Sequence, residues 1–94
     1  MADLSNSKYL GVWKGVSVSL LGRTEALDVE NILTLNADGT ATYTSPDEVR
    51  EYTWKETNYG VFLDGKSDLK LTDDNGMLKT RVFGFVTLNF EKQA

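Results

Sequence analysis

The 94-residue chain has no cysteine and no histidine, and each absence excludes a class of chemistry. Without cysteine there are no disulfide bonds, thiol nucleophiles or thiolate metal ligands, and the redox compartment is left open. Without histidine the chain lacks the commonest general base and the commonest ligand of transition metals. The sequence therefore predicts no metal site and no cofactor.

Long apolar runs and clusters of positive charge are also missing. No segment approaches the length of a transmembrane helix, and residues 1–6 lack the apolar run of a signal peptide. The net charge is −4, and the ten basic residues are scattered among fourteen acidic ones. Such a chain offers no basic stripe to a phosphate backbone or to an anionic membrane surface. We therefore predict a soluble domain with no nucleic-acid partner and no membrane insertion.

The remaining polar residues do not form a recognisable catalytic group. The acidic pairs Asp47-Glu48 and Asp73-Asp74 fall in expected turns, where carboxylates solubilise a surface, and not in an evident cleft. The segment Asp73-Asp74-Asn75-Gly76 lacks the ligand spacing of a calcium loop and is typical of a hairpin turn. No histidine is present to activate a serine. We interpret the chain as a non-enzyme without catalytic residues.

Short β-runs separated by turns are what the sequence does contain. Its length fits one domain, residues 1–94, and its 40% of hydrophobic residues is ordinary for a globular protein. Apolar and polar residues alternate within each run, which is typical of antiparallel strands with one buried face. Closure into a barrel would remove the exposed edges. The fold class is therefore predicted as all-β, a single small antiparallel meander barrel of about eight short strands. The predicted strands are residues 10–20, 29–36, 40–44, 50–56, 61–63, 68–72, 77–82 and 86–91, with residues 21–25 as a loop.

Four segments in a fixed order suggest a family. They are Gly11-Val12-Trp13 on the first strand, Asp38-Gly39-Thr40 in a hairpin, Tyr52-Thr53-Trp54 at mid-chain and Phe90-Glu91-Lys92 near the end. Over residues 9–92 the chain resembles the small lipocalin-like domains of bacterial exported proteins and lipoproteins, most of them of unknown function. The resemblance implies an extracellular or cell-surface location and the binding of a small apolar ligand.

The same resemblance assigns a role to Trp13, which by position plugs the closed end of the barrel. It also implies a basic side chain from a late strand that packs over this tryptophan, with Arg81 and Lys79 as the candidates. The chain is much shorter than a full lipocalin, and short strands enclose little space. The calyx is therefore expected to be shallow or filled by its own side chains.

Several large aromatic residues share the inward parity of their strands. They fit a packed core, since large aromatic side chains dominate small cores and interiors are close-packed. They also fit the lining of a small apolar pocket in which tyrosine hydroxyls act as polar handles. The candidate ligand-binding residues are Tyr43, Tyr52, Trp54 and Phe90.

A second group of apolar residues breaks the alternation. Phe83 and Phe85 flank Gly84 where a hairpin turn is expected, an unusual place for two aromatic rings. Either a bulge at Gly84 returns one ring to the core, or the rings form an exposed patch for a protein partner or for weak self-association. The candidate partner-binding residues are Ile32, Phe62, Phe83 and Phe85.

Two functions remain open at this stage. The first is a non-enzymatic lipocalin-like domain that binds a small apolar molecule in the barrel or at its mouth. The second is a structural or protein-interaction domain of an exported bacterial protein that uses the exposed aromatic patch. A cavity above roughly 300 Å³ lined by Trp54 and Tyr43 would favour the first, and a continuous exposed patch would favour the second.

Overall fold

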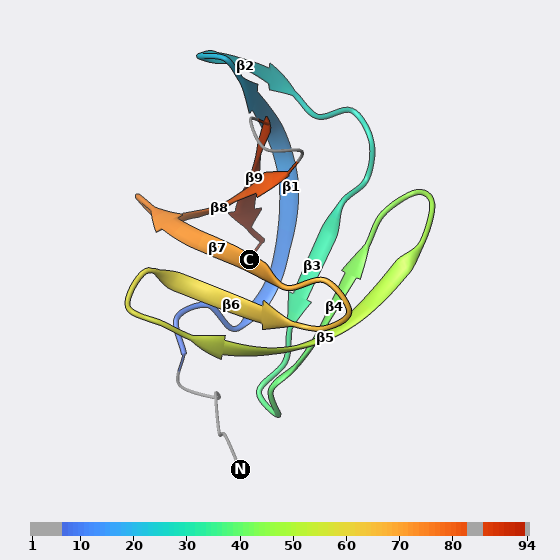
Figure 1. Cartoon of the computed structure of the whole chain (residues 1–94), viewed down its shortest axis with the longest axis vertical. Coiled ribbons are helices and arrows are strands. Elements are labelled where there is room, and N and C mark those ends of the chain that lie inside the picture. The colour runs from blue at the N-terminus through green and yellow to red at the C-terminus, as the bar shows by residue number, and fades with distance from the viewer. Residues whose placement is uncertain (1–6, 83–85, 94) are drawn as a thin grey trace.

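The computed structural model describes residues 7–82 and 86–93, which form nine strands and no helix (Figure 1). Each strand is antiparallel to its neighbours in the sheet, and β1 also pairs with β9, so that the sheet closes on itself. The prediction of an all-β antiparallel barrel is confirmed. The strands are β1 (Gly11–Leu20), β2 (Arg23–Ala26), β3 (Ile32–Leu35), β4 (Thr40–Thr44), β5 (Val49–Glu56), β6 (Gly60–Asp64), β7 (Leu69–Asp74), β8 (Met77–Val82) and β9 (Val86–Lys92).

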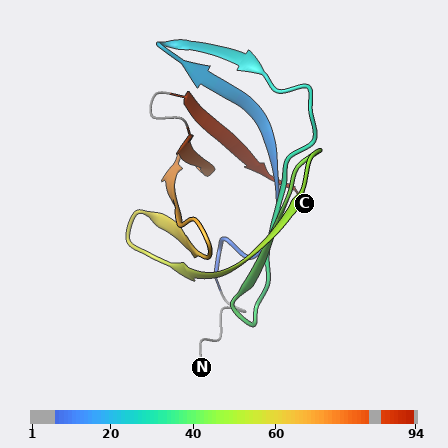
Figure 2. The ribbon, with the colours of Figure 1, turned by 45° about the vertical axis from the view of Figure 1, so that its right-hand side comes forward.

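Strand β1 joins two parts of the sheet. Its first four residues pair with β3, and most of its length pairs with β9, with a register shift between Gly15 and Ser17. Its last four residues pair on the other side with β2. Eight strands, β1 and β3 to β9, thus form the closed ring, and β2 is an additional strand beside it. Figure 2 shows the β1–β2 hairpin extending past the rest of the barrel.

The prediction of a loop over residues 21–25 is wrong, because β2 begins at Arg23. Leu21 and Gly22 both have positive φ, 49° and 82°, as in the two-residue turns that fit the twist of a hairpin. All four residues of β2 are exposed, so the strand has no alternation between apolar and polar positions. A sequence pattern that depends on one buried face could not detect it.

The barrel core follows the predicted alternation. The buried positions of β3, β5 and β8 alternate with half-buried or exposed ones, as expected for strands with one inward face. The core cavity measures only about 30 Å³, which is room for about one water molecule. The interior is therefore filled by its own side chains. The buried apolar residues are Tyr9, Trp13, Leu33, Leu35, Ala41, Tyr52, Trp54, Val61, Leu63, Leu71, Leu78, Leu88 and Phe90.

The turn before β1 closes one end of the barrel. Trp13 is buried, and its indole Nε1 donates a hydrogen bond to the Tyr9 carbonyl oxygen at 2.8 Å. The Tyr9 hydroxyl in turn donates to Asp73 Oδ2 at 2.8 Å, and Lys8 Nζ lies 3.3 Å from the same oxygen. The hydrogen bond from Tyr9 is the main cause of the lowered pKa of the Asp73 carboxyl. These contacts fix the N-terminal turn across the end that contains Trp13.

Neither Arg81 nor Lys79 is placed to pack over Trp13, and that expectation is corrected. Both alternate with the buried Leu78 and Thr80, so they lie on the outer face of β8. Lys79 Nζ instead contacts Asp74 Oδ2 at 2.9 Å.

A basic side chain from the last strand does face the tryptophan, but it is Lys92. This residue pairs with Trp13 in the β1–β9 ladder. Its Nζ donates to the Lys8 carbonyl oxygen at 2.9 Å.

Candidate ligand site at the open end of the barrel

The barrel end opposite Trp13 carries two cavities, of about 340 and 300 Å³. Both are lined by Glu48 and Arg50, so these two residues at the start of β5 form a wall common to both cavities. Each is about ten times the volume of the core cavity. The first is lined by Glu48, Arg50, Glu51, Tyr52, Lys66 and Ser67, and the second by Leu27, Asn31, Tyr43, Ser45, Glu48, Arg50 and Leu88.

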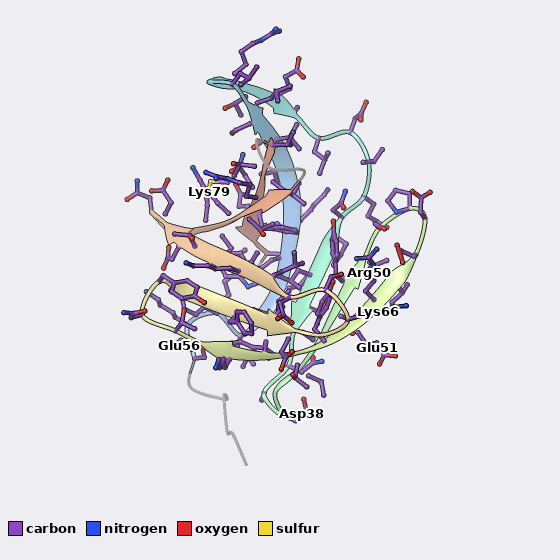
Figure 3. The ribbon with its side chains drawn as sticks, in the orientation of Figure 1. Asp38, Arg50, Glu51, Glu56, Lys66 and Lys79 are labelled. Carbon is purple, nitrogen blue, oxygen red and sulfur yellow. The ribbon has the colours of Figure 1, made fainter. Side chains whose placement is uncertain are left out.

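Arg50 lies at the rim because β5 extends past its partner there. The β5–β6 ladder begins at Thr53, which leaves Arg50 beyond it on the same strand face as the buried Tyr52. Its guanidinium Nη2 donates to Glu48 Oε2 at 2.9 Å. Figure 3 shows Arg50 and Lys66 on the same side of the barrel, with Lys79 away from them.

Tyr52 brings a buried hydroxyl to this end. Its side chain is only 5% exposed, and no described residue forms a hydrogen bond with the hydroxyl. Arg50 lies two positions before Tyr52 on the same face of β5, and both side chains line the first cavity. A buried polar group without a partner typically costs about 1–3 kcal/mol. The open end therefore holds a donor that the described residues leave unused.

Gly65 allows the Tyr52 ring to lie against the β6–β7 turn. A Cβ atom at position 65 would lie 2.5 Å from Tyr52 Cδ1 and 3.0 Å from Cε1, which is too close for carbon atoms. Any larger residue would push the turn or the ring away. The glycine thus sets how Tyr52 sits beside Lys66 and Ser67.

Tyr43 lines the second cavity and is held in place by Asn31. The Tyr43 hydroxyl donates to Asn31 Oδ1, and burial raises the pKa of this phenol, with a smaller contribution from Tyr52. The Asn31 carbonyl oxygen accepts from the Gly15 amide at 2.8 Å, which ties the loop before β3 to β1. The polar end of Tyr43 is thus satisfied within the protein, in contrast to that of Tyr52.

The structure separates the four predicted ligand-binding residues into two pairs. Tyr43 and Tyr52 reach the open end and line its cavities. Trp54 is buried, and its Nε1 donates to the Asn36 carbonyl oxygen at 2.8 Å. Phe90 is buried in the core, where the Tyr43 ring meets it edge-on with 6.1 Å between centroids. The second pair thus packs the core.

The predicted partner-binding residues do not form a continuous exposed patch among the residues described. Ile32 and Phe62 are each half-buried, and Lys55 Nζ lies 5.5 Å from the centre of the Phe62 ring. Phe83 and Phe85 lie outside the described residues. The most exposed large apolar side chain that is described belongs to Leu21, in the β1–β2 turn.

The sequence interpretation missed Arg50, although a signal was present. Positions 50, 52 and 54 share one face of β5, and the last two carry Tyr52 and Trp54. A charged residue at the end of an inward-facing series marks either the rim of the barrel or a buried charge. The contribution of Asn31 had no comparable signal, because it depends on a loop contact.

Residues 7–82 and 86–93 include no group of three or more acidic side chains that could hold a metal ion. They also form no helix with the length and apolarity that a membrane crossing requires. Comparison with protein families, curated proteins and solved structures found no match to the chain. The lipocalin-like resemblance therefore stays a prediction from the sequence.

Removing the Tyr52 hydroxyl should stabilise the protein. We expect Tyr52→Phe to raise the free energy of unfolding by about 1 kcal/mol, because a buried donor without a partner is removed and the ring stays. Urea unfolding at equilibrium measures this as a higher midpoint with an unchanged slope. Tyr43→Phe is the matched control: it removes a hydroxyl that Asn31 satisfies, and it should lower stability by about 1 kcal/mol. A loss of stability in Tyr52→Phe would contradict the assignment of a spare donor.

Proposed function

We propose that the chain is a non-enzymatic lipocalin-like domain that binds a small, largely apolar molecule at the open end of its barrel. One observation carries the proposal: two cavities of about 340 and 300 Å³ share Arg50 in their lining and one of them has an apolar wall, whereas the core cavity measures about 30 Å³. A larger hollow of about 560 Å³ beside β7 and β8 is lined almost entirely by charged and hydroxyl side chains. Ligand sites in proteins usually span about 300–1,000 Å³. The ligand therefore lies on top of the filled barrel and not within it.

The two cavities supply different surfaces to such a ligand. Leu27, Tyr43 and Leu88 contribute apolar surface to the second cavity, and Asn31 and Ser45 add polar groups at its edge. The first cavity is lined by four charged residues together with Tyr52 and Ser67. An apolar surface with a few fixed polar groups is the usual composition of a small-molecule site.

The neutral apolar dye N-phenyl-1-naphthylamine tests this proposal. We expect saturable binding that increases the fluorescence of the dye. Ser45→Phe, which fills the second cavity, should weaken binding at least tenfold. Thr53→Phe is the matched control, because it adds the same side chain at an exposed position on β5 away from the cavities. Unchanged binding in Ser45→Phe, or no binding to the wild-type protein, would contradict a ligand site at the open end.

The second candidate function, a protein-interaction domain that uses Ile32, Phe62, Phe83 and Phe85, has no comparable support from the described residues. Its two described members are half-buried. We therefore propose only the ligand-binding function.

A further inference from the structure

A buried hydroxyl group without a hydrogen-bond partner at the open end points to the chemistry of the ligand. Among the described residues, two buried side-chain polar atoms have no hydrogen-bond partner: the Tyr52 hydroxyl oxygen and Asn89 Oδ1. Asn89 is held away from the open-end cavities by hydrogen bonds to Ser17 and Ser19. Tyr52 lines the first cavity itself. The unused group that bears on a ligand is therefore a phenol.

Arg50 supplies further donors at the same place. A guanidinium group has five N–H donors and no acceptor, and the described contacts use Nη2 toward Glu48. Tyr52 lies two positions further along the same face of β5, and both side chains line the first cavity. A guanidinium and a phenol that face one cavity are satisfied together by a group with two acceptor oxygens. A carboxylate has this geometry and binds arginine through short, charge-assisted hydrogen bonds.

The charges around the cavity favour one negative charge on the ligand over two. Arg50 and Lys66 line the first cavity with Glu48 and Glu51, so its formal charges balance. A carboxylate adds a single charge, whereas a phosphate dianion would meet two nearby acidic side chains. The Glu48 side chain is about half exposed, and an exposed ion pair of this kind contributes little to stability. The Glu48 carboxylate can therefore be displaced from one edge of the Arg50 guanidinium by the carboxylate of the ligand.

We propose that the ligand is an amphipathic monocarboxylate whose carboxylate binds Arg50 and Tyr52 and whose apolar part lies over Leu27 and Leu88. The proposal rests on the open-end site proposed above and adds the chemical class of its ligand. Because Arg50 lines both cavities, a carboxylate bound to its guanidinium lies next to the apolar lining of the second cavity. Tyr52 selects the head group, and the second cavity holds the chain.

Octanoate and 1-octanol test the proposal because they share one alkyl chain and differ in the head group. Both are titrated into ¹⁵N-labelled protein at pH 7, with the signals of Arg50 and Tyr52 as reporters. We expect octanoate to bind about tenfold or more tightly than 1-octanol, as a charge-assisted hydrogen bond to arginine supplies. The Arg50 Nε–H signal should shift with octanoate and not with 1-octanol.

Variants then assign the preference to named side chains. Arg50→Gln should weaken octanoate binding about tenfold or more and change 1-octanol binding less than twofold. Tyr52→Phe should weaken octanoate binding severalfold. Arg81→Gln makes the same change of charge at an exposed position on the outer face of β8 and should leave both affinities within twofold. Each variant is checked for folding by its amide spectrum.

The possible results separate this proposal from the one on which it rests. Equal affinities for octanoate and 1-octanol would overturn the carboxylate assignment and leave the open-end site supported. Octanoate binding that Arg81→Gln weakens as much as Arg50→Gln would also overturn it, because the effect would be one of net charge. If neither compound binds while the neutral dye does, only the carboxylate proposal fails. If the dye fails as well, both proposals are wrong.

Discussion

Replacement of Trp13 by alanine should lower the free energy of unfolding by about 3–5 kcal/mol, the usual cost of removing a large buried aromatic side chain. The side chain is only 2% exposed and fills the barrel at its closed end. Its loss leaves a cavity that the surrounding strands can close only in part. It also leaves the Tyr9 carbonyl oxygen without the indole hydrogen bond.

Chemical denaturation measures this effect, with the fluorescence of Trp54 as the reporter in the variant. The control is Val12→Ala, one position along the same strand, where the side chain is 39% exposed on the outer face. We expect that control to cost less than about 1 kcal/mol, since little apolar surface leaves the protein interior. A cost below about 1 kcal/mol for Trp13→Ala would contradict its role as the plug of the barrel.

The sequence predicts the ring of the barrel well because burial there follows a simple alternation. Leu33 and Leu35 on β3, or Leu63 on β6, each face a core that their neighbours do not reach. The same alternation does not predict strand β2, because both faces of that strand are exposed. Its existence depends on the backbone conformation of Leu21 and Gly22, and leucine is not a residue that favours positive φ.

The candidate site is predicted only in part. Parity places Tyr43 and Tyr52 on the inner face, and the structure brings both to the open end. Parity alone does not show how far along the barrel a residue lies. It therefore groups Trp54 and Phe90 with the two tyrosines, although both pack the core. The hydrogen-bond partner of each hydroxyl is not predictable either. Asn31 accepts the hydrogen bond of Tyr43 from a loop, and no described residue forms a hydrogen bond with the Tyr52 hydroxyl.

The filled interior and the open-end cavities follow from the number and the length of the strands. A ring of eight strands has an interior just wide enough for inward side chains to fill, and strands of four to ten residues add little depth above that core. Residues such as Arg50, which pairs with β4 but lies beyond the end of the β5–β6 ladder, then form the rim and surround space that the core does not fill. A short barrel thus places any ligand at its mouth, where polar groups such as the Tyr52 hydroxyl can meet it.

Gly60→Ala should be among the most destabilising single substitutions in this chain, with a loss of about 3 kcal/mol or more. Gly60 has a φ of +150°, which strains any residue with a Cβ atom by about 1–3 kcal/mol. That Cβ atom would also lie 2.3 Å from the Leu71 carbonyl oxygen and 2.9 Å from the Asp73 amide nitrogen. Both contacts are with backbone, so strand β7 would have to move.

The movement would reach the closed end of the barrel through Asp73. Its amide donates to the Tyr59 carbonyl oxygen at 2.7 Å, and its carboxylate accepts from the Tyr9 hydroxyl. Thermal and urea unfolding of Gly60→Ala and of Gly76→Ala make the matched comparison, because Gly76 also has positive φ but has open space around it. Gly76→Ala should show the cost of conformation alone, about 1 kcal/mol. Equal losses in the two variants would mean that the close approach of β6 and β7 contributes nothing, whereas a larger loss at Gly60 would identify that approach as a requirement of the barrel.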